Sequence, residues 1–214
     1  MLSNFKSILF IKMKNILFVG HSILVRLFSF LLNNIDSRCK QDFNLREEFK
    51  IVKKCHSGLS FKKISRIYGG SIEKLFDNLV YEMTIIQLGG NDFERFQNRP
   101  IKMAKKLVKF AKSLKKIGQT KKIVICHLLP RSEGNKRYSL SYKKALKYRS
   151  WAKEVNYYLK IFASHKFIIW NHQQNFSTFR RSCFLNDGIH LSNHGNLLLY
   201  KSIRGAILYA LNTS

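Results

Sequence analysis

The sequence predicts an α/β protein, a three-layer α/β/α sandwich with a five-stranded parallel, flavodoxin-like sheet. Three observations support this prediction. Five short apolar runs alternate with segments of helical periodicity, a pattern typical of a parallel sheet covered by helices and joined by right-handed crossovers. The length of 214 residues with 45% hydrophobic content suffices for one domain with a substantial core. Two prolines and eleven glycines argue against a disordered or repeat-built chain.

The first half of the chain supplies three expected strands. Each runs into a turn segment that contains glycine, and they are Lys14–Gly20, Phe49–Cys55 and Met83–Leu88. The expected helices are Ser22–Leu32, Ser60–Tyr68 and Ser71–Leu79. Each begins with a serine, and a serine hydroxyl at this position can cap the free N–H groups of the first turn.

The clearest helix is expected over Pro100–Ile117, with proline in its first turn and Gly118 after its end. Its apolar residues form one stripe, and lysines occupy the other face. The elements expected after it are a strand Lys122–Leu129, a helix Lys143–Ser164, a strand Lys166–Trp170, an irregular stretch from Asn171 to Asn186, and a last helix from Leu191-Ser192 to about Leu211.

The N-terminal residues lack the features of a targeting segment. The apolar run Ile8–Ile11, between Lys6 and Lys12, is too short for a signal-peptide core and precedes no small-residue cleavage site. Nothing in the chain approaches the roughly 18 apolar residues of a membrane span. We expect residues 1–12 to be an N-terminal extension and 13–214 the folded domain. An intracellular location is expected, with the four widely spaced cysteines as thiols.

The charge balance is strongly basic. Lys and Arg number 39 against 12 Asp and Glu, a formal net charge of +27. Between Arg95 and Lys153 there are 19 Lys and Arg but one acid, Glu133. Such a balance bears on solubility and polyanion affinity, not on fold. Two interpretations stand equally: a solvated face in a lysine-rich composition, or a surface for nucleic acid or an anionic membrane.

Polar groups follow three of the expected strands and precede the last helix. Ser22 follows the first strand, Gly58 the second and Asn91 the third, while Asp187 and His190 lie just before the last helix. Because the carboxyl ends of parallel strands meet at one edge of a sheet, we expect these groups to lie close together.

This set of residue types points to nucleophilic catalysis. An Asp three residues before a His can hold one imidazole nitrogen and leave the other to accept a proton from a serine. We therefore predict Ser22 as nucleophile, His190 as general base and acid, and Asp187 as its partner. The Ser22 N–H, the Gly58 N–H and the Asn91 side-chain amide are the candidate donors of an oxyanion hole, where one donor lowers the barrier by about 3 kcal/mol.

Four stretches of the chain resemble the sequence blocks of the SGNH (GDSL-type) hydrolases. They are Gly20-His21-Ser22-Ile23, Ser57-Gly58, Gly89-Gly90-Asn91-Asp92 and Asp187-Gly188-Ile189-His190. Together they span roughly residues 14–212. The resemblance implies an α/β/α sandwich and hydrolysis of ester bonds without a metal or organic cofactor. It assigns the triad to Ser22, His190 and Asp187.

Two departures accompany the resemblance. His21 stands where the family usually has an Asp that is not the triad acid, so the hydrogen bonds around the nucleophile are expected to differ. The Gly-His-Ser start, the Asp-Gly-Ile-His-Leu-Ser stretch and the Ser-Ile-Arg-Gly-Ala-Ile-Leu tail resemble esterase-like domains beside retroelement reading frames in animals.

The sequence thus predicts a serine esterase acting on small or medium acyl esters, as a carboxylesterase, acetylesterase or lipase-like enzyme. Each site residue also has a purely structural interpretation: Ser22 as a helix cap, Gly58 and Asn91 as turn residues, and His190 as a buried histidine. The alternative function is a basic nucleic-acid-binding protein that keeps the hydrolase fold with little or no turnover.

Overall fold

The computed structural model describes residues 13–33, 39–45, 49–135, 140–172, 176 and 181–213. The expected N-terminal extension, residues 1–12, lies outside them. The strands are β1 (Lys14–Gly20), β2 (Phe49–Cys55), β3 (Tyr81–Gln87), β4 (Thr120–Cys126) and β5 (Ile168–Trp170). The helices are α1 (Ser22–Asn33), α2 (Phe61–Ile67), α3 (Phe93–Phe96), α4 (Pro100–Lys116), α5 (Tyr142–Ala163) and α7 (Asn193–Asn212), with 3-10 turns η1 (Ile72–Leu75), η2 (Gly90–Asp92), η3 (Ser164–Lys166) and η4 (Arg181–Cys183).

The five strands form one parallel sheet in the order β2-β1-β3-β4-β5. This is the flavodoxin-like order that the sequence predicts. Strand β1 lies inside the sheet between β2 and β3, and its Ile16 to Val19 are fully buried, as expected for a strand with helices on both faces. Strand β2 contains three lysines, Lys50, Lys53 and Lys54, which suits its place at the edge.

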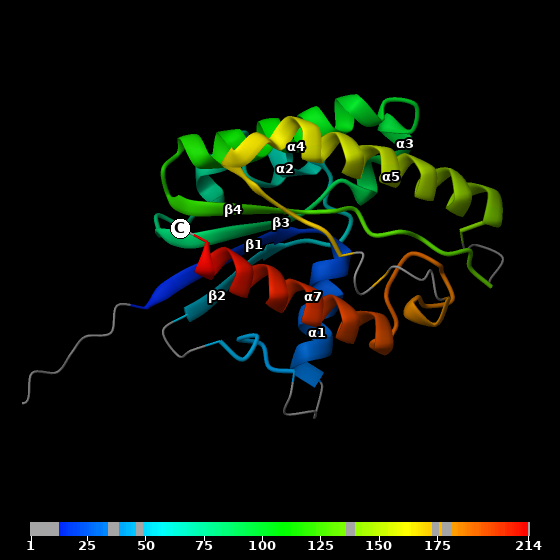
Figure 1. The fold of residues 1–214 in the computed structure, drawn as a ribbon, viewed down its shortest axis with the longest axis horizontal. Coiled ribbons are helices and arrows are strands. Elements are labelled where there is room, and N and C mark those ends of the chain that lie inside the picture. Colours follow the sequence, from blue (N-terminus) through cyan, green and yellow to red (C-terminus); the bar gives the residue numbers. More distant parts are fainter. Residues whose placement is uncertain are drawn as a thin grey trace, which may run out of the picture.

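Helices cover both faces of the sheet, which confirms the three layers (Figure 1). Helices α2, α4 and α5 pack on one face, where their apolar side chains join those of β1, β3 and β4 in one core. Helices α1 and α7 pack side by side on the other face over a second core. Helix α1 begins where β1 ends, and the segment that precedes α7 lies at the same edge of the sheet.

Two predicted elements are wrong in extent. The helix expected over Ser71–Leu79 is only the short turn η1, because Asp77 and Asn78 adopt left-handed backbone angles, φ +46° and +59°, that end it. The strand expected over Lys122–Leu129 is β4, which pairs from Thr120 opposite Tyr81 and ends at Cys126. Its start is set by the neighbouring strand, which a single segment's sequence does not reveal.

The remaining predicted elements match their ranges to within two residues at either end, and β1 and β2 match at both ends, whereas α3 and the other short η turns were not predicted. In the described residues, no helix is both long and apolar enough to cross a membrane.

Candidate active site

Ser22 lies where β1 ends, as the first residue of α1. The helix-cap prediction for Ser22 is wrong, because the preceding residue, His21, occupies the cap position. The carbonyl of His21 accepts the first helical hydrogen bonds from Leu24 and Val25, and its Nδ1 accepts from the N–H of Ile23 at 3.4 Å. The Ser22 hydroxyl is therefore not engaged by its own helix, and the side chain is only 9% exposed.

The structure brings Ser22 together with His190, which is 168 residues away in the chain. The distance between Ser22 Oγ and His190 Nε2 is 3.1 Å, and that between His190 Nδ1 and Asp187 Oδ2 is 2.6 Å. Both lie within the range of hydrogen bonds. Serine, imidazole and carboxylate thus form one continuous chain of contacts, in the order a nucleophile, a base and an orienting acid require.

Asp187 is held as a carboxylate. Burial alone would raise its pKa, but hydrogen bonds from the His190 ring and from the backbone N–H groups of His190 and Ile189 outweigh that effect and lower the pKa below its ordinary value. The same bonds fix the direction of the carboxylate. An ionised acid in this position accepts the Nδ1 proton of His190 and leaves Nε2 to face Ser22 with its lone pair.

A second loop supports the Asp187–His190 segment. Gly188 has a left-handed φ of +72°, and a side-chain carbon placed on it would lie 2.2 Å from the Ser132 carbonyl oxygen. The Ser132 N–H donates to the Gly188 carbonyl at 2.7 Å, and the Asn135 N–H donates to the Asn186 carbonyl at 2.8 Å. The loop after β4 thus lies directly against the candidate catalytic segment at a glycine that leaves it room.

Gly58 and Asn91 line the same cavity as Ser22 and His190, a space of about 490 Å³. Gly58 has φ +68° in the turn after β2. The Asn91 amide donates one hydrogen to the Leu59 carbonyl at 3.0 Å, which leaves its second hydrogen for a ligand. Among the described residues, the N–H groups of Ser22 and Gly58 have no hydrogen-bond acceptor. All three residues that could supply oxyanion donors therefore line this cavity, and each has a donor that no described residue uses.

Asp92 has a role that the sequence did not identify. Its buried carboxylate accepts from the N–H of Phe61, the first residue of α2, at 3.2 and 3.3 Å. Together with the Asn91–Leu59 contact, this bond ties the loop after β3 to the loop that contains Gly58. Burial raises the pKa of Asp92 to about 6, despite the opposing effects of the Phe61 N–H, Lys106 and Arg95. A signal was present, because Asp92 follows Asn91 directly in the sequence.

His21 and Arg131 lie beside the nucleophile, and neither was predicted as a site residue. His21 is buried, and its Nε2 and the Tyr148 hydroxyl both lie next to Gly90 at the cavity wall. Burial, followed by the charges of Arg131 and His190, lowers the pKa of His21 to about 3, so the ring is neutral. Arg131 comes from an irregular loop without periodicity, and no pattern in the sequence marks it.

The fold resembles those of solved esterase structures. A GDSL-like lipase from Bacteroides thetaiotaomicron superposes with a TM-score of 0.65 at 16% identity, covering 92% of this chain and 89% of that one. A carbohydrate acetylesterase from Sinorhizobium meliloti gives a TM-score of 0.62 at 16% identity, covering 92% and 99%. The aryl esterase of M. smegmatis gives 0.60 at 16% identity, also covering 92% and 99%.

The chain has an SGNH (GDSL-type) hydrolase fold. No protein-family model and no curated protein sequence matches the chain. The likeness therefore rests on the SGNH hydrolase fold and not on overall sequence identity. Within that fold, the four predicted blocks lie around one cavity at the carboxyl edge of the sheet, where ligands bind in open α/β proteins.

Proposed function

We propose that the protein is a serine esterase that hydrolyses small or medium acyl esters through an acyl-enzyme intermediate. The observation that carries the proposal is the line of contacts from Ser22 Oγ to His190 Nε2 and from His190 Nδ1 to Asp187 Oδ2, at 3.1 and 2.6 Å. Its occurrence in a fold shared with lipases and acetylesterases supports the choice of ester bonds.

In the proposed reaction, His190 Nε2 takes the hydroxyl proton as Ser22 Oγ attacks the acyl carbonyl. The carbonyl oxygen becomes an oxyanion that accepts hydrogen bonds from the Ser22 and Gly58 N–H groups and the Asn91 amide. His190 then gives its proton to the leaving alcohol, and the C–O bond breaks. Water, deprotonated by His190, then attacks the acyl-serine; the acyl C–Oγ bond breaks, His190 returns the proton to Ser22 Oγ, and the carboxylic acid leaves. Asp187 stabilises the imidazolium throughout.

The size of the site supports an ester of modest length. The cavity of about 490 Å³ at Ser22 is within the range of small-molecule sites. A second, much smaller space of about 10 Å³ adjoins Ser22 next to Leu128 and Tyr148. This space holds about one water molecule, so it leaves no room for a long chain behind the nucleophile. A short-chain chromogenic ester, 4-nitrophenyl acetate, is the first substrate to try.

The test compares the parent protein with Ser22→Ala. We expect turnover of 4-nitrophenyl acetate by the parent, a loss of at least about 10³-fold in Ser22→Ala, and labelling of the parent alone by a fluorophosphonate probe. Ser113→Ala is the matched control, because Ser113 lies on α4 and bonds only to a backbone carbonyl of its own helix. No turnover and no labelling in a folded parent protein would refute the proposal.

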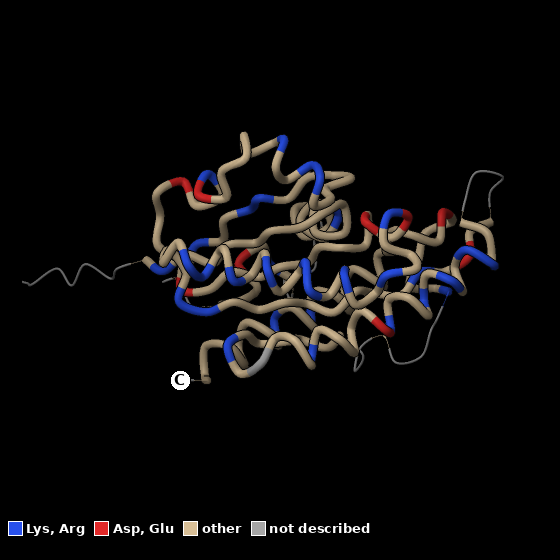
Figure 2. The backbone as a smooth tube through the Cα atoms, turned by 90° about the horizontal axis from the view of Figure 1, so that it is seen from above, with Lys and Arg blue, Asp and Glu red and all other residues tan. Residues whose placement is uncertain are grey.

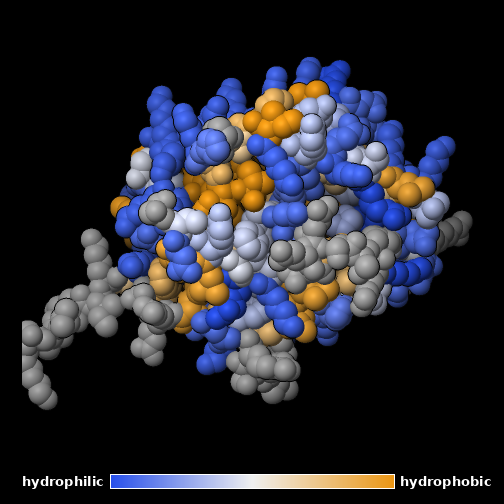
Figure 3. Space-filling model, viewed as in Figure 1, coloured by the Kyte–Doolittle hydropathy of each residue, from blue (hydrophilic) through white to orange (hydrophobic). Residues whose placement is uncertain are grey.

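A second candidate function is favoured by the exposed lysines of α4 and α5. Figure 2 looks onto this layer and shows Lys and Arg recurring along it, and Figure 3 shows hydrophilic side chains projecting from the same edge. The exposed lysines are Lys102, Lys105, Lys109, Lys112, Lys115 and Lys116 on α4 and Lys143, Lys144, Lys147, Lys153 and Lys160 on α5. We propose that this face binds nucleic acid, with or without esterase turnover.

Binding through this face must release counterions from the polyanion, so affinity falls steeply with salt. We expect binding of single-stranded RNA or DNA to weaken by about 10³-fold or more between 50 and 200 mM salt, for about seven or more phosphate contacts. Fluorescence anisotropy at a series of salt concentrations measures the slope of log affinity against log salt. Replacing Lys105, Lys109 and Lys112 by Glu should make this slope less steep. Salt-independent binding, or none at 50 mM salt, contradicts the proposal.

A further inference from the structure

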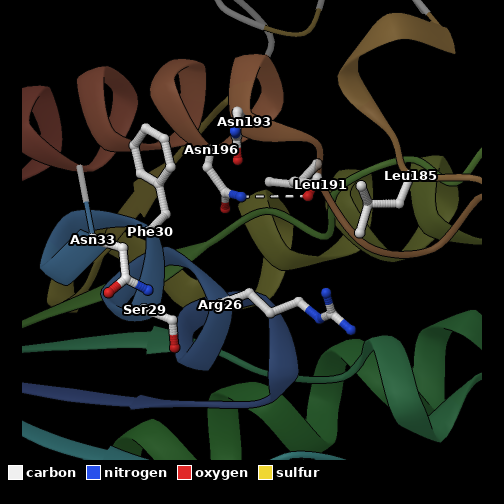
Figure 4. A pocket seen from close by; sticks show the side chains of 8 residues that line it. All are labelled: Arg26, Ser29, Phe30, Asn33, Leu185, Leu191, Asn193 and Asn196. Carbon is white, nitrogen blue, oxygen red and sulfur yellow. Dashed lines mark hydrogen bonds between the residues drawn. The ribbon is translucent and has the colours of Figure 1, made fainter. Parts of the chain in front are cut away.

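Two arginine residues line the cavity at Ser22, and the proposed reaction uses neither. They are Arg26 and Arg131. Arg26 follows Ser22 by four residues on α1, so both side chains lie on one helix face a single turn apart. Figure 4 shows the Arg26 side chain extending from α1 away from the Asn33 end of the helix. Arg26 also lines a neighbouring cavity of about 320 Å³ between α1 and α7.

Arg131 is held in place by contacts with Gly90 and Tyr148, which among the described residues do not use all of its donors. One guanidinium nitrogen, Nη2, donates to the Gly90 carbonyl at 2.8 Å, and the guanidinium carbon lies 4.0 Å from the centre of the Tyr148 ring. Guanidinium has five N–H donors in a rigid plane. A pre-oriented guanidinium of this kind binds a carboxylate with little further loss of side-chain entropy.

The two arginines form no ion pair with an acid among the described residues. In the part of the chain that the structure describes, no carboxylate lies within 4 Å of Arg26 or Arg131 to form an ion pair. The one acidic side chain lining this cavity there is Glu94, which is exposed on α3. The lining of the cavity thus carries two arginines against one glutamate, while the Asp187 carboxylate lies behind His190 and is occupied by its hydrogen bonds. In a protein of formal net charge +27, this lining favours an anionic group on the ligand.

We propose that the ester hydrolysed at Ser22 carries a carboxylate, which Arg26 and Arg131 bind. This inference rests on the proposed esterase function and adds the class of substrate. A carboxylate is planar and accepts paired N–H bonds, which matches guanidinium geometry. It belongs to either the acyl part or the alcohol part of the ester, and both place it within the same cavity.

The experiment uses two pairs of esters that differ in one charge. For the acyl side, the pair is 4-nitrophenyl hydrogen succinate and 4-nitrophenyl methyl succinate. For the alcohol side, the pair is 4-acetoxybenzoate and methyl 4-acetoxybenzoate. For each pair, the ratio of kcat/KM for the anionic member to that for the neutral member is measured in the parent protein, Arg26→Gln and Arg26→Glu. Differences in intrinsic reactivity cancel when the ratios are compared between proteins.

In at least one pair, we expect Arg26→Gln to lower the ratio about threefold and Arg26→Glu about tenfold, as for a partly exposed ion pair. The pair that responds identifies the side of the ester that carries the carboxylate. The matched controls Lys112→Gln and Lys112→Glu remove the same charge from the exposed face of α4, and their ratios should equal that of the parent. The inference is overturned if the Arg26 variants lose kcat/KM equally for the anionic and the neutral member of each pair, or if the ratios stay unchanged in both pairs.

A binding measurement separates this inference from the esterase proposal. Calorimetric titration of Ser22→Ala with 4-hydroxybenzoate and with its methyl ester needs no turnover. We expect Ser22→Ala to bind the carboxylate more tightly than the methyl ester, and the added Arg26→Glu change to remove that preference. A protein that hydrolyses no ester but shows this preference refutes the esterase proposal and supports the anion site. Equal binding of both compounds refutes the anion site.

Discussion

Asp187 divides two tasks between its carboxylate oxygens. Oδ1 accepts the N–H groups of Ile189 and His190 at 2.8 and 2.9 Å, which shapes the loop. Oδ2 faces the His190 ring at 2.6 Å. An asparagine keeps the first task, since its oxygen still accepts. Its NH₂ group replaces Oδ2 and donates to Nδ1, which forces the ring into the tautomer with a hydrogen on Nε2.

Asp187→Asn should therefore lower kcat/KM for 4-nitrophenyl acetate by roughly 10² to 10⁴-fold, while the melting temperature changes little. Asp187→Ala should lower both, because it also removes the loop acceptor. Asp77→Asn is the control for the loss of an acid, because Asp77 pairs with Lys54 away from the site. An Asp187→Asn variant within threefold of the parent activity would show that Asp187 does not orient His190.

Among single residues, the sequence predicts those whose side chain suits a catalytic role and whose position lies at the end of an expected strand or the start of a helix. Ser22, Asn91 and the Asp187–His190 spacing follow from strand ends and residue types, and the structure brings them to one cavity. Arg131 could not be predicted, because its position depends on a carbonyl and a ring distant in sequence, Gly90 and Tyr148.

Among the elements, the loop Asn186–His190 depends most on the backbone of another segment. Gly188→Ala forces a side-chain carbon toward the Ser132 carbonyl oxygen at a left-handed φ. We expect a loss of about 1–3 kcal/mol in the free energy of unfolding and a loss of activity, because His190 shifts with the loop. Chemical denaturation and kcat/KM for 4-nitrophenyl acetate measure the two effects.

Gly118→Ala is the matched control, because Gly118 has a similar φ of +79° but no atom within 4 Å of the added carbon. This variant should lose stability through backbone strain alone and keep its activity. If Gly188→Ala and Gly118→Ala behave alike, the contact between the two loops has no part in positioning His190.

Element boundaries were predictable where a local signal sets them. Strands β1 and β2 match the predicted ranges, because each ends just before a turn that contains glycine or at a glycine itself. The boundaries of β4 depend on its pairing with β3. The short length of η1 depends on the left-handed backbone angles of Asp77 and Asn78, which the apolar pattern of this segment does not indicate. Hydrophobic periodicity carries no information on strand pairing or on left-handed backbone angles, so it could not predict the limits of β4 or of η1.

For the molecule as a whole, three buried histidines control stability at acid pH. Burial is the main cause that lowers the pKa of His21 and His172 to about 3 and of His127 to about 4. His172 lies between Gln87 Oε1 and Ser202 Oγ, partners that a neutral ring satisfies with one donor and one acceptor. Between pH 6.5 and about 4, the unfolded chain binds protons that the folded chain does not, so stability falls as the pH falls.

Asp92 acts in the opposite sense, because its pKa of about 6 makes the folded chain bind one extra proton between pH 6 and 4. Three protons bound on unfolding by the histidines, against one released by Asp92, make the free energy of unfolding change by about 3 kcal/mol per pH unit near pH 5.

Urea denaturation at pH 4.5 to 7 measures this slope of the free energy of unfolding. His172→Gln should reduce the slope by about half, and the exposed His194→Gln is the control for loss of an imidazole. A pH-independent free energy of unfolding across this range contradicts the account.

The whole-molecule architecture was predictable because few parallel arrangements satisfy right-handed crossovers with helices on both faces. Strand order 2-1-3-4-5 and the gathering of polar strand ends follow from that rule. The distribution of charge around the cavity does not follow from the crossover rule, because only the folded chain brings Arg26 and Arg131 to the same cavity.

The candidate nucleophile and its base come from opposite ends of the chain: Ser22 follows the first strand, and His190 precedes the last helix. During synthesis, the ribosome therefore releases Ser22 long before the segment that activates it exists. Helix α7, which docks against α1, must emerge and pack before His190 has a fixed position. A nascent or C-terminally truncated chain would thus be inert toward esters, and the appearance of activity would report that the last helix has docked.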